Sequence, residues 1–190
     1  MQKLITDIKD CTVCAAHLPL GPRPVFTADP KSKILIIGQA PGTKVHASGI
    51  PWDDQSGKRL RTWIGVDNET FYNPTLFGII PMGFCYPGKG KSGDLPPRTE
   101  CAPLWHTALL DKMPEVELIL LIGQYAQKYY LEDKAKRTLT ETVSNFEAYL
   151  PRYFTLPHPS PRNTFWIRRN PWFEESVIPL LQERVQKLIY

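Results

Sequence analysis

Two short loops carry polar side chains on stiff backbone. Residues 38–42 (GQAPG) follow an apolar run, and their glycines and proline allow a tight turn whose backbone N–H groups can approach an anionic oxygen. Residues 158–163 (HPSPRN) hold His158 and three further polar side chains between prolines. A histidine fixed in this way can donate a hydrogen bond to a leaving group, although most lone histidines are only solvated or structurally paired. The first loop by itself is equally well explained as a plain strand-exit turn.

The four cysteines form a second candidate site. Cys11 and Cys14 make a C-x2-C pair, and Cys85 and Cys101 follow far along the chain, on either side of a proline-rich stretch. In a chain expected to be intracellular, this set favours a metal site over disulfides, because thiols stay reduced there. Four thiolates suit either a [4Fe–4S] cluster or tetrahedral zinc, and their spacing does not separate the two. Four unrelated buried thiols are the alternative.

Short apolar runs alternate with helical patterns along the chain, which predicts a parallel sheet covered by helices. We therefore expect one three-layer α/β/α domain over residues 1–190, with a central, mostly parallel, four-stranded sheet. Such sheets bind ligands at the carboxyl ends of their strands, where both polar loops lie. The predicted strands are 33–38, 76–80, 117–123 and 152–156, the predicted helices are 3–10, 59–64, 100–112, 124–131, 137–149 and 171–189, and 39–56 and 86–98 are expected to be loops.

The composition is that of an ordinary folded protein. The 190 residues, 42% hydrophobic and 22% charged, suit one domain with one sizeable core. A net charge of +4 is compatible with a polyanionic partner but does not require one. No apolar run is long enough for a membrane span, and the first residues are too polar for a signal peptide. We expect a cytoplasmic monomer.

Taken together, the two loops resemble the motifs of the uracil-DNA glycosylase superfamily, which have the forms G-[QE]-x-P and H-P-S-P. Residues 38–42 are most similar to the G-E-A-P-G motif of the iron–sulfur uracil-DNA glycosylases, and residues 158–163 to the second motif of the single-strand-selective uracil glycosylases. The resemblance spans residues 11–165. It implies the glycosylase fold and the excision of uracil, or of another deaminated base, from DNA. The cysteine layout also resembles the iron–sulfur enzymes, which implies a [4Fe–4S] cluster rather than zinc.

The resemblance implies roles for individual residues. Trp52 stands where the family has an aromatic ring that stacks on the flipped base, although a tryptophan is more often a core residue. Asp54, in a segment similar to the D-x-S-G of another branch, would position the attacking water, with Asp53 as the alternative. The expected catalytic residues are Asp54, His158 and Gln39, the expected base contacts are Gln39, Ala40, Trp52 and His158, and the expected DNA contacts are Lys89, Lys91, Arg98, Ser160, Arg162 and Asn163.

Two positions depart from the family pattern. Ala40 stands where the classical uracil enzymes have a water-positioning Asp. The iron–sulfur enzymes also have Ala at this position. Pro81 stands where the iron–sulfur enzymes have an Asn that recognises the uracil edge, and proline has no side-chain hydrogen bond to offer. The identity of the excised base is therefore open. A catalytically altered nucleic-acid-binding member of the same fold is the alternative, and a hydrolase of free nucleosides is a third hypothesis.

Overall fold

Four parallel strands form the centre of the computed structural model, which describes all 190 residues. Their order across the sheet is β2 (Phe77–Ile79), β1 (Ile34–Ile37), β5 (Leu118–Ile122) and β6 (Tyr153–Leu156). Each neighbouring pair is parallel. β1, β2 and β5 are buried along their whole length, which is why they appear in the sequence as continuous apolar runs without alternation. The predicted four-stranded parallel sheet is confirmed.

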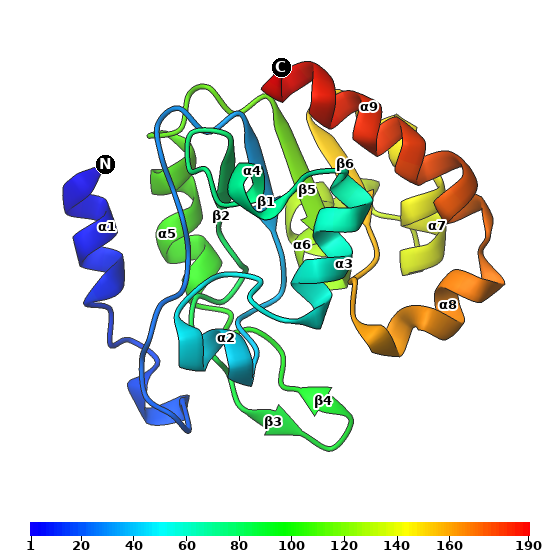
Figure 1. Ribbon diagram of the computed structural model, residues 1–190. Helices are drawn as coiled ribbons and strands as arrows, with labels where there is room; N and C mark the ends of the chain where they lie inside the picture. Colours follow the sequence, from blue (N-terminus) through cyan, green and yellow to red (C-terminus); the bar gives the residue numbers. More distant parts are fainter.

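Helices cover both faces of the sheet (Figure 1). Alternate side chains of β1 point to opposite faces, so that Ile34 and Ile36 join one core while Leu35 and Ile37 join the other. Helix length and hydropathy do not allow any of the helices to span a bilayer. The first core is closed by α3 (Gln55–Ile64), α4 (Asn68–Phe71), α7 (Leu139–Ser144), α8 (Thr164–Arg169) and α9 (Ile178–Ile189), and the second by α1 (Gln2–Lys9), α5 (Cys101–Leu110) and α6 (Gln124–Leu131).

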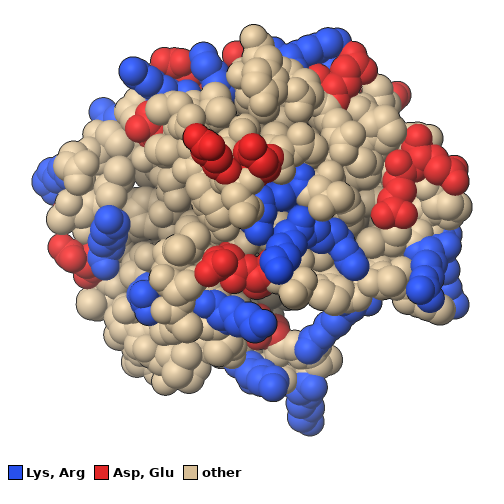
Figure 2. Space-filling view, in the orientation of Figure 1, with Lys and Arg blue, Asp and Glu red and all other residues tan.

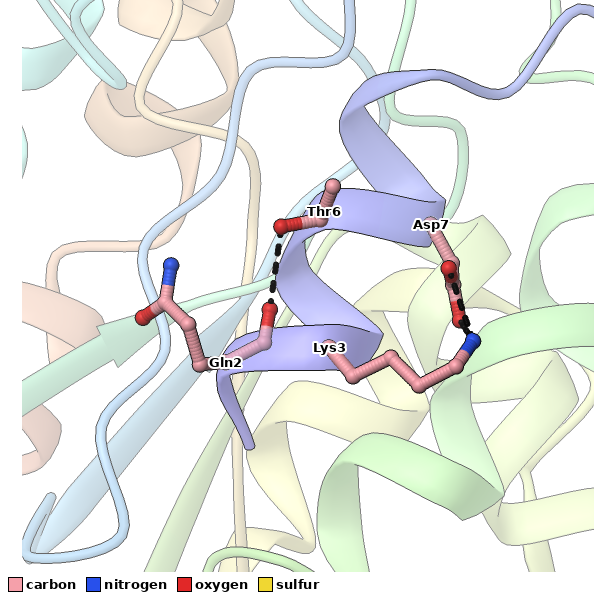
Figure 3. Close-up of polar contacts among 4 residues, drawn as sticks. All are labelled: Gln2, Lys3, Thr6 and Asp7. Atoms are coloured by element: carbon pink, nitrogen blue, oxygen red, sulfur yellow. Dashed lines mark hydrogen bonds and ion pairs between the residues drawn. The ribbon is translucent and has the colours of Figure 1, made fainter.

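Helix α1 is fixed by its buried face. Ile8 is completely buried in the second core, next to α5. On the outer face, Lys3 Nζ lies 2.8 Å from the Asp7 carboxylate and Thr6 Oγ1 donates to the Gln2 carbonyl at 3.2 Å (Figure 3). Exposed ion pairs of this kind contribute little to stability, so burial of Ile8 positions the helix and the C-x2-C pair that follows it.

Several segments differ from the predicted pattern. The expected loop 39–56 contains the short helix α2 (Thr43–Ser48), which Gly49 ends in a left-handed conformation with φ 74°. The expected loop 86–98 contains a hairpin of β3 (Lys89–Gly90) and β4 (Gly93–Asp94). Helix α8 was not predicted, and the expected helix 137–149 is divided into α7 and the 3-10 turn η3 (Phe146–Tyr149). The remaining turns are η1 (Ala15–His17), η2 (Glu132–Lys134), η4 (Pro161–Asn163) and the π-helical turn η5 (Phe173–Val177) before α9.

Candidate active site

A pocket of about 540 Å³ lies at the carboxyl edge of the sheet. Each of the four strands contributes a lining residue soon after it ends: Pro81 after β2, Gln39 after β1, Gln124 after β5 and His158 after β6. This is the edge at which parallel sheets bind ligands. The structure thus brings the two polar loops together, and the remaining lining residues are Val25, Gly38, Ala40, Pro41, Gly42, Val45, Pro51, Trp52, Asp54, Ser56, Ile79, Ser92, Gly93, Asp94, Ser160, Arg162 and Asn163.

Trp52 forms one wall of the pocket. Its backbone has a left-handed φ of 57°, a strained conformation for a bulky residue. Two glycines make room for it: a Cβ on Gly38 would lie 2.8 Å from Trp52 Cζ2, and a Cβ on Gly57 would lie 1.7 Å from the Trp52 carbonyl oxygen. The indole and the His158 imidazole have ring centroids 5.6 Å apart and planes inclined by 35°. The surroundings therefore hold Trp52 where its face can stack on a planar ligand.

Asp54 both caps a helix and lines the pocket. Its Oδ1 accepts a hydrogen bond from the Gly57 N–H at 2.8 Å, which satisfies one of the free donors in the first turn of α3. Asp53, the alternative from the sequence, is exposed and does not line the pocket. Of the two neighbouring carboxylates, Asp54 is the one that can act on a ligand in the pocket.

His158 is held as a neutral hydrogen-bond donor. The Ser160 N–H donates to its Nδ1 at 3.2 Å, which requires a lone pair on Nδ1 and leaves the proton on Nε2. Loss of water from around the ring lowers the pKa of His158, and the nearby Asp54 carboxylate opposes this shift. The loop is fixed by Asn163 Nδ2, which donates to the His158 carbonyl at 2.8 Å, and by Arg59 Nη1, which donates to the Ser160 carbonyl at 3.0 Å.

The β3–β4 hairpin closes one side of the pocket and is held by residues of both loops. Arg162 Nη1 donates to the Ser92 carbonyl at 2.5 Å, and Gln39 Nε2 donates to the Leu95 carbonyl at 3.1 Å. Two side chains that the sequence assigned to substrate contacts therefore also position this wall. Both hydrogen bonds join segments that are far apart in the chain, so no local sequence pattern predicts them.

Four polar residues that line the pocket had no assigned role in the sequence analysis: Ser56, Ser92, Asp94 and Gln124. Asp94, on β4, faces the pocket without a hydrogen-bonded partner; desolvation raises its pKa, Arg162 and Lys89 act to lower it, and Asp54 acts to raise it. Only the folding of the hairpin brings Asp94 to the pocket. Gln124 could have been found, because it follows a predicted strand just as Gln39 does.

The residues expected to contact DNA occupy different environments. Lys89 and Lys91 are exposed on the hairpin, and Figure 2 shows Lys and Arg side chains gathered around this part of the molecule. Ser160 Oγ accepts from the Arg162 N–H at 3.2 Å, so that residue is engaged within its own loop. Arg98 lies against the cysteine thiols instead of beside the two lysines.

The four cysteines, all unpaired, line one small and mostly apolar cavity. Burial raises the pKa of Cys85 to about 11 and that of Cys101 to about 12, so that these thiols stay neutral unless a cation is bound. No three Cys, His, Asp or Glu side chains are arranged to hold a single metal ion. Arg98, paired with Glu100 at 2.5 Å, also lines the cavity, and its buried Nε has no hydrogen-bond partner.

Comparison with known proteins identifies the family. Residues 25–182 match the model of the uracil DNA glycosylase superfamily. The chain belongs to this superfamily. Among solved structures, this glycosylase-superfamily member is similar to a candidate uracil DNA glycosylase from Methanosarcina acetivorans, with 18% identity, 83% of this chain and 93% of that chain covered, and a TM-score of 0.45. It is also similar to wild-type SMUG2 of Pedobacter heparinus, with 14% identity, 99% and 94% covered, and a TM-score of 0.38.

The match confirms the resemblance to the superfamily that both loops indicated. The likeness to its iron–sulfur branch stays a prediction, as do the roles of the individual site residues.

Replacement of Gly38 by Ala is expected to displace the Trp52 indole, because the new methyl group would lie 2.8 Å from Cζ2. In protein labelled with 5-fluorotryptophan, the ¹⁹F resonance of Trp52, assigned with Trp52→Phe, should shift in Gly38→Ala. Gly21→Ala is the control, because Gly21 is also a constrained turn glycine, with φ 75°, but has no atom near its added Cβ. An unchanged Trp52 resonance in Gly38→Ala would contradict the packing described.

The ¹⁵N NMR shifts of His158 should show the neutral Nε2–H tautomer at pH 7 and a pKa below 6.5. Asp54→Asn should lower that pKa further, because it removes the opposing carboxylate. The pKa of His158 is lower in the folded protein than in the unfolded chain, so the unfolded chain binds the proton at a higher pH. The free energy of unfolding should therefore decrease as the pH falls below 6.5. An imidazolium at pH 7, or an Nδ1–H tautomer, would contradict the assignment.

Proposed function

We propose that this protein is a monofunctional DNA glycosylase that hydrolyses the N-glycosidic bond of uracil, or of another deaminated base, in DNA as a step of base excision repair. One observation carries the proposal: a neutral His158 donor, the Asp54 carboxylate and the Trp52 ring line the same pocket. Membership of the uracil DNA glycosylase superfamily supports it.

In the proposed reaction, the target base flips out of the DNA stack and lies against Trp52. As the bond between C1′ and the base nitrogen breaks, its electron pair leaves with the base and positive charge develops on the sugar. Asp54 stabilises that charge and accepts a proton from the water whose oxygen bonds to C1′. His158 Nε2–H and the backbone N–H groups around Gln39 and Ala40 donate hydrogen bonds to the carbonyl oxygen on which negative charge collects. The departed base anion takes its proton from solvent.

We assign the DNA backbone to the surface around the β3–β4 hairpin. Lys89 and Lys91 are exposed there, and Arg162 joins the hairpin to the loop 158–163 at the rim of the pocket. Cationic side chains beside a base pocket bind phosphates and supply affinity independent of sequence. Ser160 and Asn163 lie at the same rim and complete the proposed contacts, which a monomer can make.

The activity is tested with single- and double-stranded oligonucleotides that carry uracil, hypoxanthine or xanthine, followed by alkaline cleavage of abasic sites. His158→Ala should slow excision by about 10²–10³-fold, the usual cost of one transition-state donor. Asp54→Asn should slow it by at least a similar factor and yet keep the cap of α3, because Asn caps helices as well as Asp does. Asp53→Asn should behave like the wild type, since Asp53 does not line the pocket.

Pro81 favours the second candidate, a nucleic-acid-binding member of the fold that has lost catalysis. That function would give tight binding to uracil-containing DNA with no abasic product, and no difference between the wild type and Asp54→Asn. Release of uracil from free deoxyuridine, with DNA left intact, would instead indicate a nucleoside hydrolase. If the wild type forms abasic sites in DNA and the Asp54 and His158 variants form far fewer, both the non-catalytic binding protein and the nucleoside hydrolase are excluded.

We also infer that the cysteine cavity holds a [4Fe–4S] cluster. Four thiols share one cavity without converging on a single ion, and a cluster needs only one thiolate for each of its irons. The unpartnered Arg98 Nε at the cavity fits a negatively charged group with sulfur acceptors. Cys11, Cys14, Cys85 and Cys101 would hold the cluster, which would cross-link the segment after α1, the loop after β2 and the start of α5. A tetrahedral zinc would require the four sulfurs to move together.

Protein purified without oxygen should be brown, absorb at about 400 nm, as cluster chromophores do, and contain about four irons and four sulfides per chain. Cys101→Ser should lose most of the iron and the colour. Colourless protein with one zinc per chain would refute the cluster and leave the glycosylase proposal standing.

A further inference from the structure

Asp94 is a pocket carboxylate that the proposed reaction does not use. Its side chain lines the pocket next to Gly42, where a Cβ would lie 3.4 Å from Asp94 Oδ2. Its backbone is held on both sides, by the Arg162 hydrogen bond to Ser92 and the Gln39 hydrogen bond to Leu95. No hydrogen bond or ion pair occupies the carboxylate itself. Asp94 is exposed, so its carboxylate is an acceptor at the pocket that is open to a ligand.

The end of β2 offers no comparable group. Pro81 has no side-chain donor, and its carbonyl oxygen already accepts a hydrogen bond from His106 Nε2 at 3.0 Å. His106 is 1% exposed and is held in turn by the Tyr130 hydroxyl, 2.7 Å from Nδ1. Pro81 can therefore make van der Waals contact with a base, but another residue must recognise the hydrogen-bonding edge of that base.

Deamination changes the base at one ring nitrogen as well as at the lost amino group. Cytosine N3 and adenine N1 carry lone pairs and accept hydrogen bonds, whereas uracil N3 and hypoxanthine N1 carry a proton and donate. An ionised carboxylate can only accept. It attracts this ring N–H in both deaminated bases and repels the lone pair at the same place in their parent bases, cytosine and adenine.

We propose that Asp94 determines specificity by accepting the ring N–H that deamination creates. The inference rests on the proposed glycosylase function and names its substrate class: uracil and hypoxanthine, a pyrimidine and a purine recognised by the same group. A pocket of about 540 Å³ has room for either ring system. The other unassigned polar side chains of the pocket are the Gln124 amide and the hydroxyls of Ser56 and Ser92. These groups both donate and accept, so they do not separate the two kinds of base.

The experiment compares single-turnover excision of uracil with 3-methyluracil, and of hypoxanthine with 1-methylhypoxanthine, because each methyl group removes the ring N–H. The wild type should prefer the unmethylated base by about 10- to 100-fold, the range expected for one hydrogen bond to a charged group. Asp94→Ala should lose most of that preference, because it removes the acceptor and makes room for the methyl group. Asp111→Asn, which changes an exposed carboxylate at the end of α5, is the matched control and should keep the wild-type preference.

Binding gives an independent measure with oligonucleotides that carry non-cleavable 2′-fluoroarabino uracil or cytosine. The wild type should bind the uracil oligonucleotide more tightly than the cytosine one. Asp94→Asn should reduce this ratio of affinities, because an amide can turn its NH₂ toward cytosine N3. Equal excision of methylated and unmethylated bases by the wild type, or an unchanged preference in both Asp94 variants, would overturn the inference alone. A wild type that releases no base at all overturns the glycosylase function and the inference with it.

Discussion

The parallel pairing of β1 between β2 and β5 is the constraint from which the pocket follows. The carboxyl ends of parallel strands lie at one edge of a sheet. The residues that follow each strand therefore lie at the same edge, however far apart they are in the sequence. Gln39 after β1 and His158 after β6 line the same pocket for this reason, although β5 lies between their strands. The rest of the pocket is built upon this edge: Trp52 fills the space that Gly38 leaves open, and the β3–β4 hairpin closes the side that the strands do not reach.

The charges of the pocket suit one kind of chemistry. Two carboxylates, Asp54 and Asp94, and one guanidinium, Arg162, line it, while His158 is neutral, so that carboxylates are in excess. An anionic pocket favours a reaction in which positive charge develops on the ligand, as it does on a sugar that loses its base. In the proposed reaction it would also make the departure of a base anion harder, which is why we assign the neutral Nε2–H of His158 and the backbone N–H groups near Gln39 to stabilise that anion.

Periodicity and motifs predicted the sheet, most of the helices and the two loops at its edge, because these depend on residues that are close in sequence. What they did not predict depends on contacts between distant segments. The hairpin exists where prolines and glycines suggested only a loop, and Asp94 reaches the pocket through it. Arg98 carries a charge typical of a surface residue, yet its position beside Cys101 places it at the thiol cavity. Gln124 followed the same strand-exit rule as Gln39 and was available to sequence reasoning.

The β3–β4 hairpin has only two residues in each strand, and ribbons of that size do not hold their shape in water. Its order comes from outside, from Arg162 and Gln39. The equilibrium that orders the hairpin is therefore linked to the equilibrium that fills the pocket. A phosphate that draws the Arg162 guanidinium away from the Ser92 carbonyl removes one of the hydrogen bonds that order the hairpin. Part of the free energy of phosphate binding is then offset by the lost stability of the hairpin.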